Sequence, residues 1–290
     1  MAGAGQVIDL HTHSTCSDGT QAPADLVRAA ARAGVAVLGL TDHDVTAGWQ
    51  EAGAQAHRLG VSLVPGIEVS CQAGGISVHL LAYLPDPDLP ALVHLLQQIR
   101  DHRRTRLRTM VGRLVADGYP LDYDEILAHS SPGATLGRPH VADALVRAGA
   151  HPDRDRAFAE VLHGRSAYYV RHWAPDVLDA IRTVRAAGGV PVMAHPFARA
   201  RGRTVADGVI EGMVRAGLAG LEVDHRDHQQ ADRDHAAELC VRWGLIPTGS
   251  SDYHGAGKPN RIAEHTTPVR SLERIVAGAT GTALLGAPLP

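Results

Sequence analysis

The sequence predicts an α/β protein in which seven strands alternate with helices around a parallel sheet or barrel. Two observations support this prediction. Short apolar runs recur along the chain, and Ala-rich amphipathic stretches separate them. The length of 290 residues is sufficient for one large barrel with a small insertion.

The predicted strands are short and follow one another along most of the chain. They are Gln6–Leu10, Ala36–Leu40, Ser62–Pro65, Ile76–Tyr83, Val190–Ala194, Ala219–Val223 and Leu245–Thr248. Predicted helices lie between several of them, and Gly34 and Gly244 are placed to end two of these helices. The helical stretches are Pro23–Ala33, Trp49–Leu59, Pro175–Ala187 and Asp232–Trp243.

One region interrupts the alternation, between the fourth and fifth strands. It contains no convincing strand and reads as several helices separated by Pro and Gly. The helical stretches are Leu89–Leu114, Asp124–Leu127, Arg138–Ala148 and Asp155–Leu162. We therefore expect a barrel domain formed by residues 1–84 and 171–290, and a mostly helical insertion domain of residues 85–170.

The composition is that of an ordinary soluble globular protein, with 44% apolar and 20% charged residues. The formal charge of −3 does not require nucleic acid as a partner. Only two Phe are present, which argues against a stacking platform for long single strands.

The cysteines and the N-terminal segment indicate where the chain acts. Cys16, Cys71 and Cys240 lie far apart, which favours a reducing compartment over a disulfide framework or a thiolate zinc site. The N-terminus has no leader pattern, and no apolar run approaches the length of a membrane span. We expect a cytoplasmic protein with no membrane association and no obligate protein partner.

Acidic and imidazole side chains recur where the predicted strands end. Loops at the carboxyl ends of parallel strands open onto one face, so these side chains should meet there. The nine candidates are His11, His13, Asp18, His43, Glu68, His79, His195, Asp252 and His254. His11 and His13 are two residues apart on a strand and can therefore face one ion.

Mixed imidazole and carboxylate ligands without thiolate are typical of Mn, Fe or Zn rather than of a structural cysteine site. Nine ligands exceed what one ion uses, so we expect two or three divalent ions, with Mn preferred. Two acids flank His43 and have simpler explanations. We expect Asp44 to cap the next helix and Asp42 to hold a ligand by a hydrogen bond.

The order of these segments closely resembles the polymerase and histidinol phosphatase (PHP) family, over nearly the whole chain. The segments are His11-Thr12-His13-Ser14, Ser17-Asp18-Gly19, Thr41-Asp42-His43-Asp44, Gly66-Ile67-Glu68-Val69-Ser70, Ala194-His195-Pro196 and Ser251-Asp252-Tyr253-His254. The resemblance implies a distorted (β/α)7 barrel and a trinuclear metal cluster held by the nine candidates.

The resemblance also implies how the ions are shared. His11, His13, Glu68 and Asp252 would hold the first ion. Glu68 would bridge to a second ion completed by His79 and His195. The third ion would be bound by Asp18, His43 and His254. No expected ligand is missing, which argues against a metal-free relic.

The insertion carries a further segment, Leu136-Gly137-Arg138-Pro139-His140, which resembles stand-alone family members that hydrolyse nucleotides. A guanidinium suits phosphate, and an imidazole can transfer a proton. We predict substrate binding by Arg138, His140, Arg199 and Lys258. We predict catalytic roles for His140, His195 and Asp252, with His140 or His195 as the proton donor to the leaving alkoxide.

The expected activity is metal-dependent hydrolysis of a nucleotide phosphate monoester. The resemblance points to the 3′-phosphate of 3′,5′-bisphosphonucleotides, with 5′–3′ trimming of short RNA as an added activity. Three alternatives stay open: a phosphatase for histidinol phosphate or a cyclic sugar phosphate, an amidohydrolase, and a non-catalytic metal-binding module. An amidohydrolase usually centres on a modified Lys, whereas Glu68 occupies the bridging position here.

Overall fold

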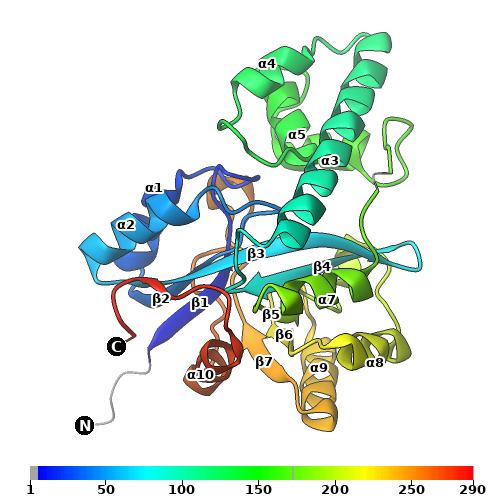
Figure 1. The fold of residues 1–290 in the computed structure, drawn as a ribbon. Helices are drawn as coiled ribbons and strands as arrows, with labels where there is room; N and C mark the ends of the chain where they lie inside the picture. The colour runs from blue at the N-terminus through cyan, green and yellow to red at the C-terminus, as the bar shows by residue number, and fades with distance from the viewer. Residues whose placement is uncertain (1–5, 172, 290) are drawn as a thin grey trace.

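The computed structural model describes residues 6–171 and 173–289. The expectation about a leader concerns residues 1–5, which lie outside the described residues, as do His172 and Pro290 of the second barrel segment. The chain has an α/β fold with a central, mostly parallel sheet and helices packed around it (Figure 1). The expected fold class is confirmed at this level.

Seven strands follow each other across the sheet in chain order. They are β1 (Val7–Thr12), β2 (Val35–Leu40), β3 (Ser62–Ala73), β4 (Ile76–Tyr83), β5 (Val190–Met193), β6 (Gly220–Asp224) and β7 (Ile246–Gly249). All seven coincide with predicted strands, although β3 is longer by eight residues than the predicted Ser62–Pro65. A short strand that the sequence did not suggest, β8 (Leu285–Gly286), pairs with β3.

The helices occupy the intervals between the strands. They are α1 (Pro23–Arg32), α2 (Trp49–Leu59), α3 (Pro90–Ala116), α4 (Tyr123–Ala128), α5 (Arg138–Arg147), α6 (Arg154–Ala157), α7 (Val177–Ala186), α8 (Asp207–Ala216), α9 (Gln230–Trp243) and α10 (Val269–Gly278). Short helical turns cover Phe158–Leu162, Arg199–Arg201 and Gly255–Gly257. Among the described residues, we find no helical segment with the length and apolar character needed to cross a bilayer.

The expectation of seven parallel strands is wrong for β4, which runs antiparallel to both β3 and β5. Gly74 and Gly75, both with positive φ, form the tight turn that joins β3 directly to β4 without a helix. Because β4 is reversed, the beginning of this strand lies at the carboxyl end of its neighbours. His79 therefore reaches that end from within β4, opposite Ser70 of β3.

Alternating side chains of the strands pack on opposite sides of the sheet. On β4, Leu80 and Ala82 join the core beneath the helices, whereas Leu81 and Tyr83 join a second apolar cluster with residues of other strands. On β6, Leu221 and Val223 belong to the core beneath the helices. Glu222, which lies between them in the strand, therefore points to the other side of the sheet.

The helices between β4 and β5 have an apolar cluster of their own. Helix α3 is shared, because Leu92 and Ile99 near its start lie in the main core while Leu107 and Leu114 lie in the separate cluster with α4 and α5. Figure 1 shows α3 rising from the sheet toward α4 and α5. The division at residue 85 stays a prediction, and the first turns of α3 pack with the sheet.

Candidate metal centre

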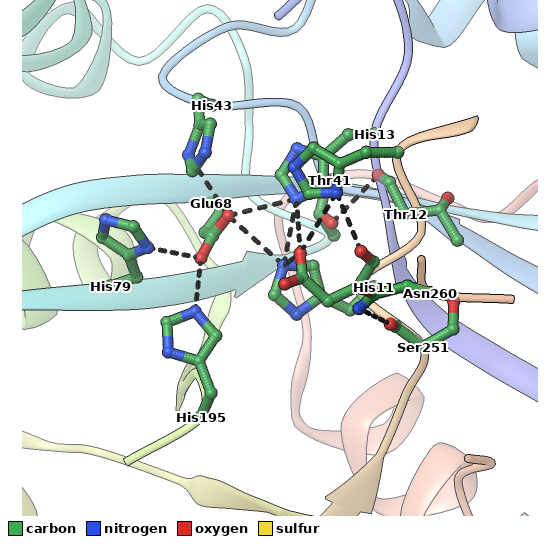
Figure 2. Close-up of polar contacts among 12 residues, drawn as sticks. His11, Thr12, His13, Thr41, His43, Glu68, His79, His195, Ser251 and Asn260 are labelled. Atoms are coloured by element: carbon green, nitrogen blue, oxygen red, sulfur yellow. Dashed lines mark hydrogen bonds and ion pairs between the residues drawn. The ribbon is translucent and has the colours of Figure 1, made fainter. Parts of the chain in front are cut away.

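Glu68 is the centre of a buried group of imidazoles at the carboxyl end of the sheet (Figure 2). Its Oε1 lies 2.7 Å from His79 Nδ1 and 3.0 Å from His195 Nε2. Its Oε2 lies 3.1–3.3 Å from nitrogens of His11, His13 and His43. One carboxylate thus faces five imidazoles that come from four strands or strand ends, because His11 and His13 both belong to β1 and its end.

The two imidazoles of the His-Thr-His segment point to one place, as the two-residue spacing predicted. The Nε2 atoms of His11 and His13 are 3.1 Å apart. Asp252 Oδ1 lies 3.5 Å from His11 Nε2 and 3.4 Å from His13 Nε2. With Glu68, these residues form a group whose ligand atoms all lie within 4.8 Å of one another.

Asp18 is the centre of another group. Its carboxylate oxygens lie 3.2 Å from His254 Nε2 and 3.8 Å from His43 Nε2. His13 also borders this group, because its Nδ1 lies 3.8 Å from Asp18. His43 faces two groups, since its Nδ1 approaches Glu68 and its Nε2 approaches Asp18.

The structure therefore brings all nine predicted ligands into one network. The three ligand groups defined by distance are His11, His13, Glu68 and Asp252; His13, Asp18, His43 and His254; and His43, Glu68 and His79. The first matches the expected grouping. The second contains the expected Asp18, His43 and His254, and also His13. The third contains His43 in place of the expected His195, which contacts Glu68 separately at 3.0 Å.

The charges of this network suit divalent cations. Burial opposes ionisation of Glu68, but the surrounding imidazoles, His79 first, hold its pKa well below the usual range. Burial also opposes protonation of His13, yet hydrogen bonds with Asp252 and Glu68 raise its pKa to about 9. In contrast, burial lowers the pKa of His195 to about 3. Buried carboxylates thus face imidazoles that cannot all carry a proton.

Two buried imidazole nitrogens of the network, His43 Nδ1 and His254 Nε2, make no hydrogen bond of suitable geometry in the described chain, although a carboxylate oxygen lies 3.2 Å from each. Such orphaned nitrogens beside ionised carboxylates are what a divalent ion would satisfy. The donor set fits more than one ion, since Glu68 and His43 each take part in two groups.

Three of the five residues other than Gly that have positive φ in the described chain lie at the same face of the sheet. Asp44, His195 and Asp252 have φ values of 54°, 30° and 51°, in the left-handed region that residues with a Cβ rarely adopt. Strained conformations of this kind occur at functional sites, where the surrounding structure holds them in place.

Asp42 makes hydrogen bonds beside the ligands, as expected, but it reaches them through Ser14 and Ser17 and not directly. Its carboxylate accepts hydrogen bonds from Ser14 N, Ser14 Oγ and Ser17 Oγ, at 2.6–2.8 Å. It therefore fixes the loop that carries His13 and Asp18.

The prediction for Asp44 is wrong, because Asp44 caps no helix. It accepts hydrogen bonds from Ser70 N and Oγ, and its Oδ2 lies 2.9 Å from Arg103 Nε. Asp44 instead joins the end of β2 to the middle of β3 and to α3. The sequence offered no signal for this pairing, because Arg103 lies 59 positions away, within an Arg-rich helix.

Glu222 of β6 is a further residue that sequence reasoning missed. Its Oε1 lies 3.1 Å from His11 Nδ1, and its Oε2 accepts a hydrogen bond from His195 N. A carboxylate on the second nitrogen of a candidate ligand fixes its tautomer and orientation. A signal was present, because an acid stands inside the apolar strand Gly-Leu-Glu-Val-Asp, where an unpaired charge is unfavourable.

We expect Glu222→Gln to weaken metal binding by about 10- to 100-fold, because His11 would lose the carboxylate that orients it. Titration of the metal-free variant with Mn²⁺, followed by activity, measures this. Asp224→Asn is a matched control, because Asp224 is exposed on the same strand and lies 4.0 Å from Arg233. Equal metal affinity of the Glu222 variant and the wild type would contradict the assigned role.

Two basic side chains contact the second carboxylate oxygen of Asp252, Oδ2. Arg201 Nη2 lies 2.6 Å and Lys258 Nζ 3.2 Å from Asp252 Oδ2. Lys258 thus lies beside the network, and its contact with substrate stays a prediction. Arg199 does not touch the network: its exposed side chain pairs with Asp232 of α9 at 3.0 Å. Arg201, which sequence reasoning did not select, occupies the place expected of Arg199.

The Arg-Pro-His segment begins α5 and approaches the metal centre from the helical region. Thr135 N donates to Cys16 O in the loop between His13 and Asp18, at 2.9 Å. His140 Nδ1 accepts a hydrogen bond from Gly137 N, which leaves the proton of the neutral ring on Nε2. Burial lowers the pKa of His140 and thereby favours this neutral form.

Arg138 donates to Leu162 O at 2.9 Å and contacts no member of the network in the described residues.

Comparisons with known proteins agree with this centre. The PHP domain matches residues 9–148. The chain is 38% identical to a 3′,5′-nucleoside bisphosphate phosphatase of Chromobacterium violaceum, over 89% of this chain and 91% of that protein. It is 35% identical to a phosphoribosyl 1,2-cyclic phosphate 1,2-diphosphodiesterase of Eggerthella lenta, over 85% of this chain and 94% of that protein.

A solved structure from Bifidobacterium adolescentis, assigned as a metal-dependent phosphoesterase, superimposes with a TM-score of 0.92 and 36% identity. The similarity covers 96% of this chain and 98% of that one. The shared fold, the sequence identity over most of the chain and the His, Asp and Glu cluster lead to one conclusion. The chain belongs to the PHP family and is a metal-dependent phosphoesterase, a hydrolase of phosphoric esters.

Proposed function

We propose that this phosphoesterase removes the 3′-phosphate from 3′,5′-bisphosphonucleotides and also trims short RNA from the 5′ end. The observation that supports this proposal is the position of the Arg-Pro-His segment beside the metal centre. Thr135 N bonds to Cys16 O, and Arg103 Nη1 donates to Leu136 O at 3.3 Å. The relative that shares 38% identity is named for this substrate class.

The ions would be held by the nine ligands of the network, as two or three divalent ions with Mn²⁺ preferred and Fe or Zn as alternatives. Such ions lower the pKa of water and stabilise negative charge on phosphoryl oxygens. We propose that Asp252 would bind a metal ion through Oδ1, while Arg201 and Lys258 contact its Oδ2. These two cations also lie where they can attract the phosphate ester.

We propose His140 as the proton donor to the leaving oxygen. As the imidazolium, His140 could give its Nε2 proton to the leaving oxygen and become neutral. The nearby Asp18 carboxylate favours this charged form, whereas burial opposes it. His195 is less suited to this role, because its Nε2 faces Glu68 at 3.0 Å within the network.

We also propose that the sheet closes into the distorted barrel expected from the family. Thr12 bridges Tyr253 in parallel, His13 N donates to Tyr253 O at 2.8 Å, and Thr267 N donates to Ile8 O at 2.9 Å. These contacts join β1 to the segment that follows β7. Residues 85–170 would then be an insertion in the barrel, and the cytoplasmic location stays a prediction from the sequence.

A second candidate is hydrolysis of a cyclic sugar phosphate, which the relative from Eggerthella lenta supports. A kinetic screen of the Mn²⁺-loaded protein separates the candidates. Its substrates are a 3′,5′-bisphosphonucleotide, 3′- and 5′-mononucleotides, short RNA, a ribosyl 1,2-cyclic phosphate and histidinol phosphate. We expect the highest kcat/KM with the bisphosphonucleotide. A higher value with the cyclic phosphate or histidinol phosphate would overturn the proposed substrate.

A further inference from the structure

One exposed tryptophan lies on the segment that leads into α7. Trp173 is 42% exposed, and no other Phe, Tyr or Trp among the described residues is exposed. Its ring packs against His102 of α3, with the ring centroids 5.1 Å apart. The next residue of α3, Arg103, donates from Nη2 to Ser70 Oγ at 2.6 Å, and Ser70 is paired with His79 across β3 and β4. The exposed ring therefore lies on the side of the metal centre where α3 meets β3 and β4.

Two arginines contact the turn between β3 and β4. Arg171 Nη2 donates to Gly75 O at 2.8 Å, and Arg203 Nη2 donates to the same oxygen at 3.5 Å. Both residues are exposed, and no carboxylate oxygen of the described chain lies within 4.0 Å of either guanidinium. Gln72 N donates to Pro175 O at 2.9 Å, so the segment that leads into α7 runs past this turn (Figure 1). Two positive charges and one aromatic ring thus share this surface.

The segment that follows β5 connects the turn to the metal centre. Arg203 lies at the turn, whereas Arg201, two residues earlier, lies 2.6 Å from Asp252 Oδ2. Gly75 is four residues before His79, which places the turn about 14 Å from this residue along β4. The His79 side chain is 25% exposed, so the metal centre is accessible on this side. The strip that runs from the metal centre to the turn is formed by Arg201, Arg203, Arg171 and Trp173.

We propose that this strip binds single-stranded RNA downstream of the nucleotide that is held at the metal centre. Arg171 and Arg203 complement the phosphates of the RNA backbone, and the Trp173 ring stacks with one base. Stacking accepts any base, and a single exposed ring suits short RNA rather than long single strands. This inference rests on the proposed trimming of RNA from the 5′ end. It assigns the surface that distinguishes RNA from a mononucleotide.

The test compares kcat/KM for a 5′-phosphorylated RNA pentamer with kcat/KM for a 3′,5′-bisphosphonucleotide, which has no downstream nucleotides, in the Mn²⁺-loaded protein. Trp173→Ala should lower the RNA value by about tenfold or more, because the loss of base stacking on one aromatic ring has an effect of this size. The nucleotide value should stay unchanged. Trp173→Phe keeps an aromatic ring and should retain most of the RNA value.

The double variant Arg171→Gln/Arg203→Gln should lower the RNA value and weaken its dependence on salt. Each lost phosphate contact should reduce the slope of log(kcat/KM) against log[salt] by about 0.7. Arg215→Gln is the matched control, because it removes an exposed positive charge from α8, where Arg215 pairs with Glu211 at 2.6 Å. The double variant also tests the strip if Trp173→Ala fails to fold.

Three results would overturn the RNA strip while hydrolysis of the bisphosphonucleotide stands. The first is an RNA value that both the Trp173→Ala and the double variant leave at the wild-type level, in which case the surface serves another kind of partner. The second is an equal loss with both substrates, because the residues would then act on the metal centre and not on RNA. The third is a wild type that hydrolyses the nucleotide but does not trim RNA. Absence of wild-type turnover with both substrates would overturn the proposed function itself.

Discussion

Replacement of Glu68 by Gln is expected to lower kcat/KM by at least about 10³-fold, because the charge stabilisation that divalent ions supply amounts to several kcal/mol. Glu68 is 1% exposed and contacts five imidazoles. The amide of Gln is nearly the same size, but it has no charge, and it places an NH2 group where one carboxylate oxygen faces imidazole nitrogens. The ions that share Glu68 would lose their common anionic ligand.

Two measurements test this result: kcat/KM on the best substrate, and the metal content of the purified protein. We expect the variant to hold at least one ion fewer per chain than the wild type. Glu51→Gln is the control, since Glu51 is exposed and bonds to Ala24 N at the start of α1. Full metal content together with wild-type turnover would show that Glu68 is not a shared ligand.

Replacement of Arg103 by Met is expected to lower the free energy of unfolding by about 3–5 kcal/mol, the usual cost of leaving one partner of a buried ion pair alone. Asp44 is fully buried, and Arg103 is 9% exposed. Arg103 Nε lies 2.9 Å from Asp44 Oδ2, and its other nitrogens reach Ser70 Oγ and Leu136 O. Met fills much of the volume, so the loss comes mainly from the unpaired carboxylate.

Urea denaturation of the metal-free protein measures this effect, with Arg104→Met as the control, because Arg104 is the exposed neighbour on α3. The double variant Asp44→Asn/Arg103→Met should recover part of the loss, since no charge is then left unpaired. A change of less than about 1 kcal/mol in the single variant, as is typical for exposed ion pairs, would show that the pair contributes little.

The candidate ligands could be predicted from the sequence because the local direction of the chain determines which way their side chains point. His11 and His13 are two residues apart on one strand, so their rings converge whatever surrounds them. His195 and Asp252 follow strands that were recognised from apolar runs, and parallel strands deliver their ends to one edge. These residues were therefore enough to anticipate the network, although the structure places Glu68 within β3 and His79 within β4 and not at strand ends.

The direction of β4 could not be predicted in the same way. An apolar run has the same pattern in either direction, and the two glycines at positions 74 and 75 were the only local sign of a hairpin. The length of β3 was missed for a related reason, because Pro65 and Gly66 usually end strands and here do not.

The α/β fold, the order of the strands and most of the candidate ligands follow from the sequence alone, because the periodicity of side chains is a local property. Only the tertiary structure decided the partners: Glu222 behind His11, Arg201 rather than Arg199 on Asp252, and Arg103 on Asp44. The physical reason is that an ion pair or a hydrogen bond depends on distance in space, and these partners lie between 51 and 211 positions apart in the chain.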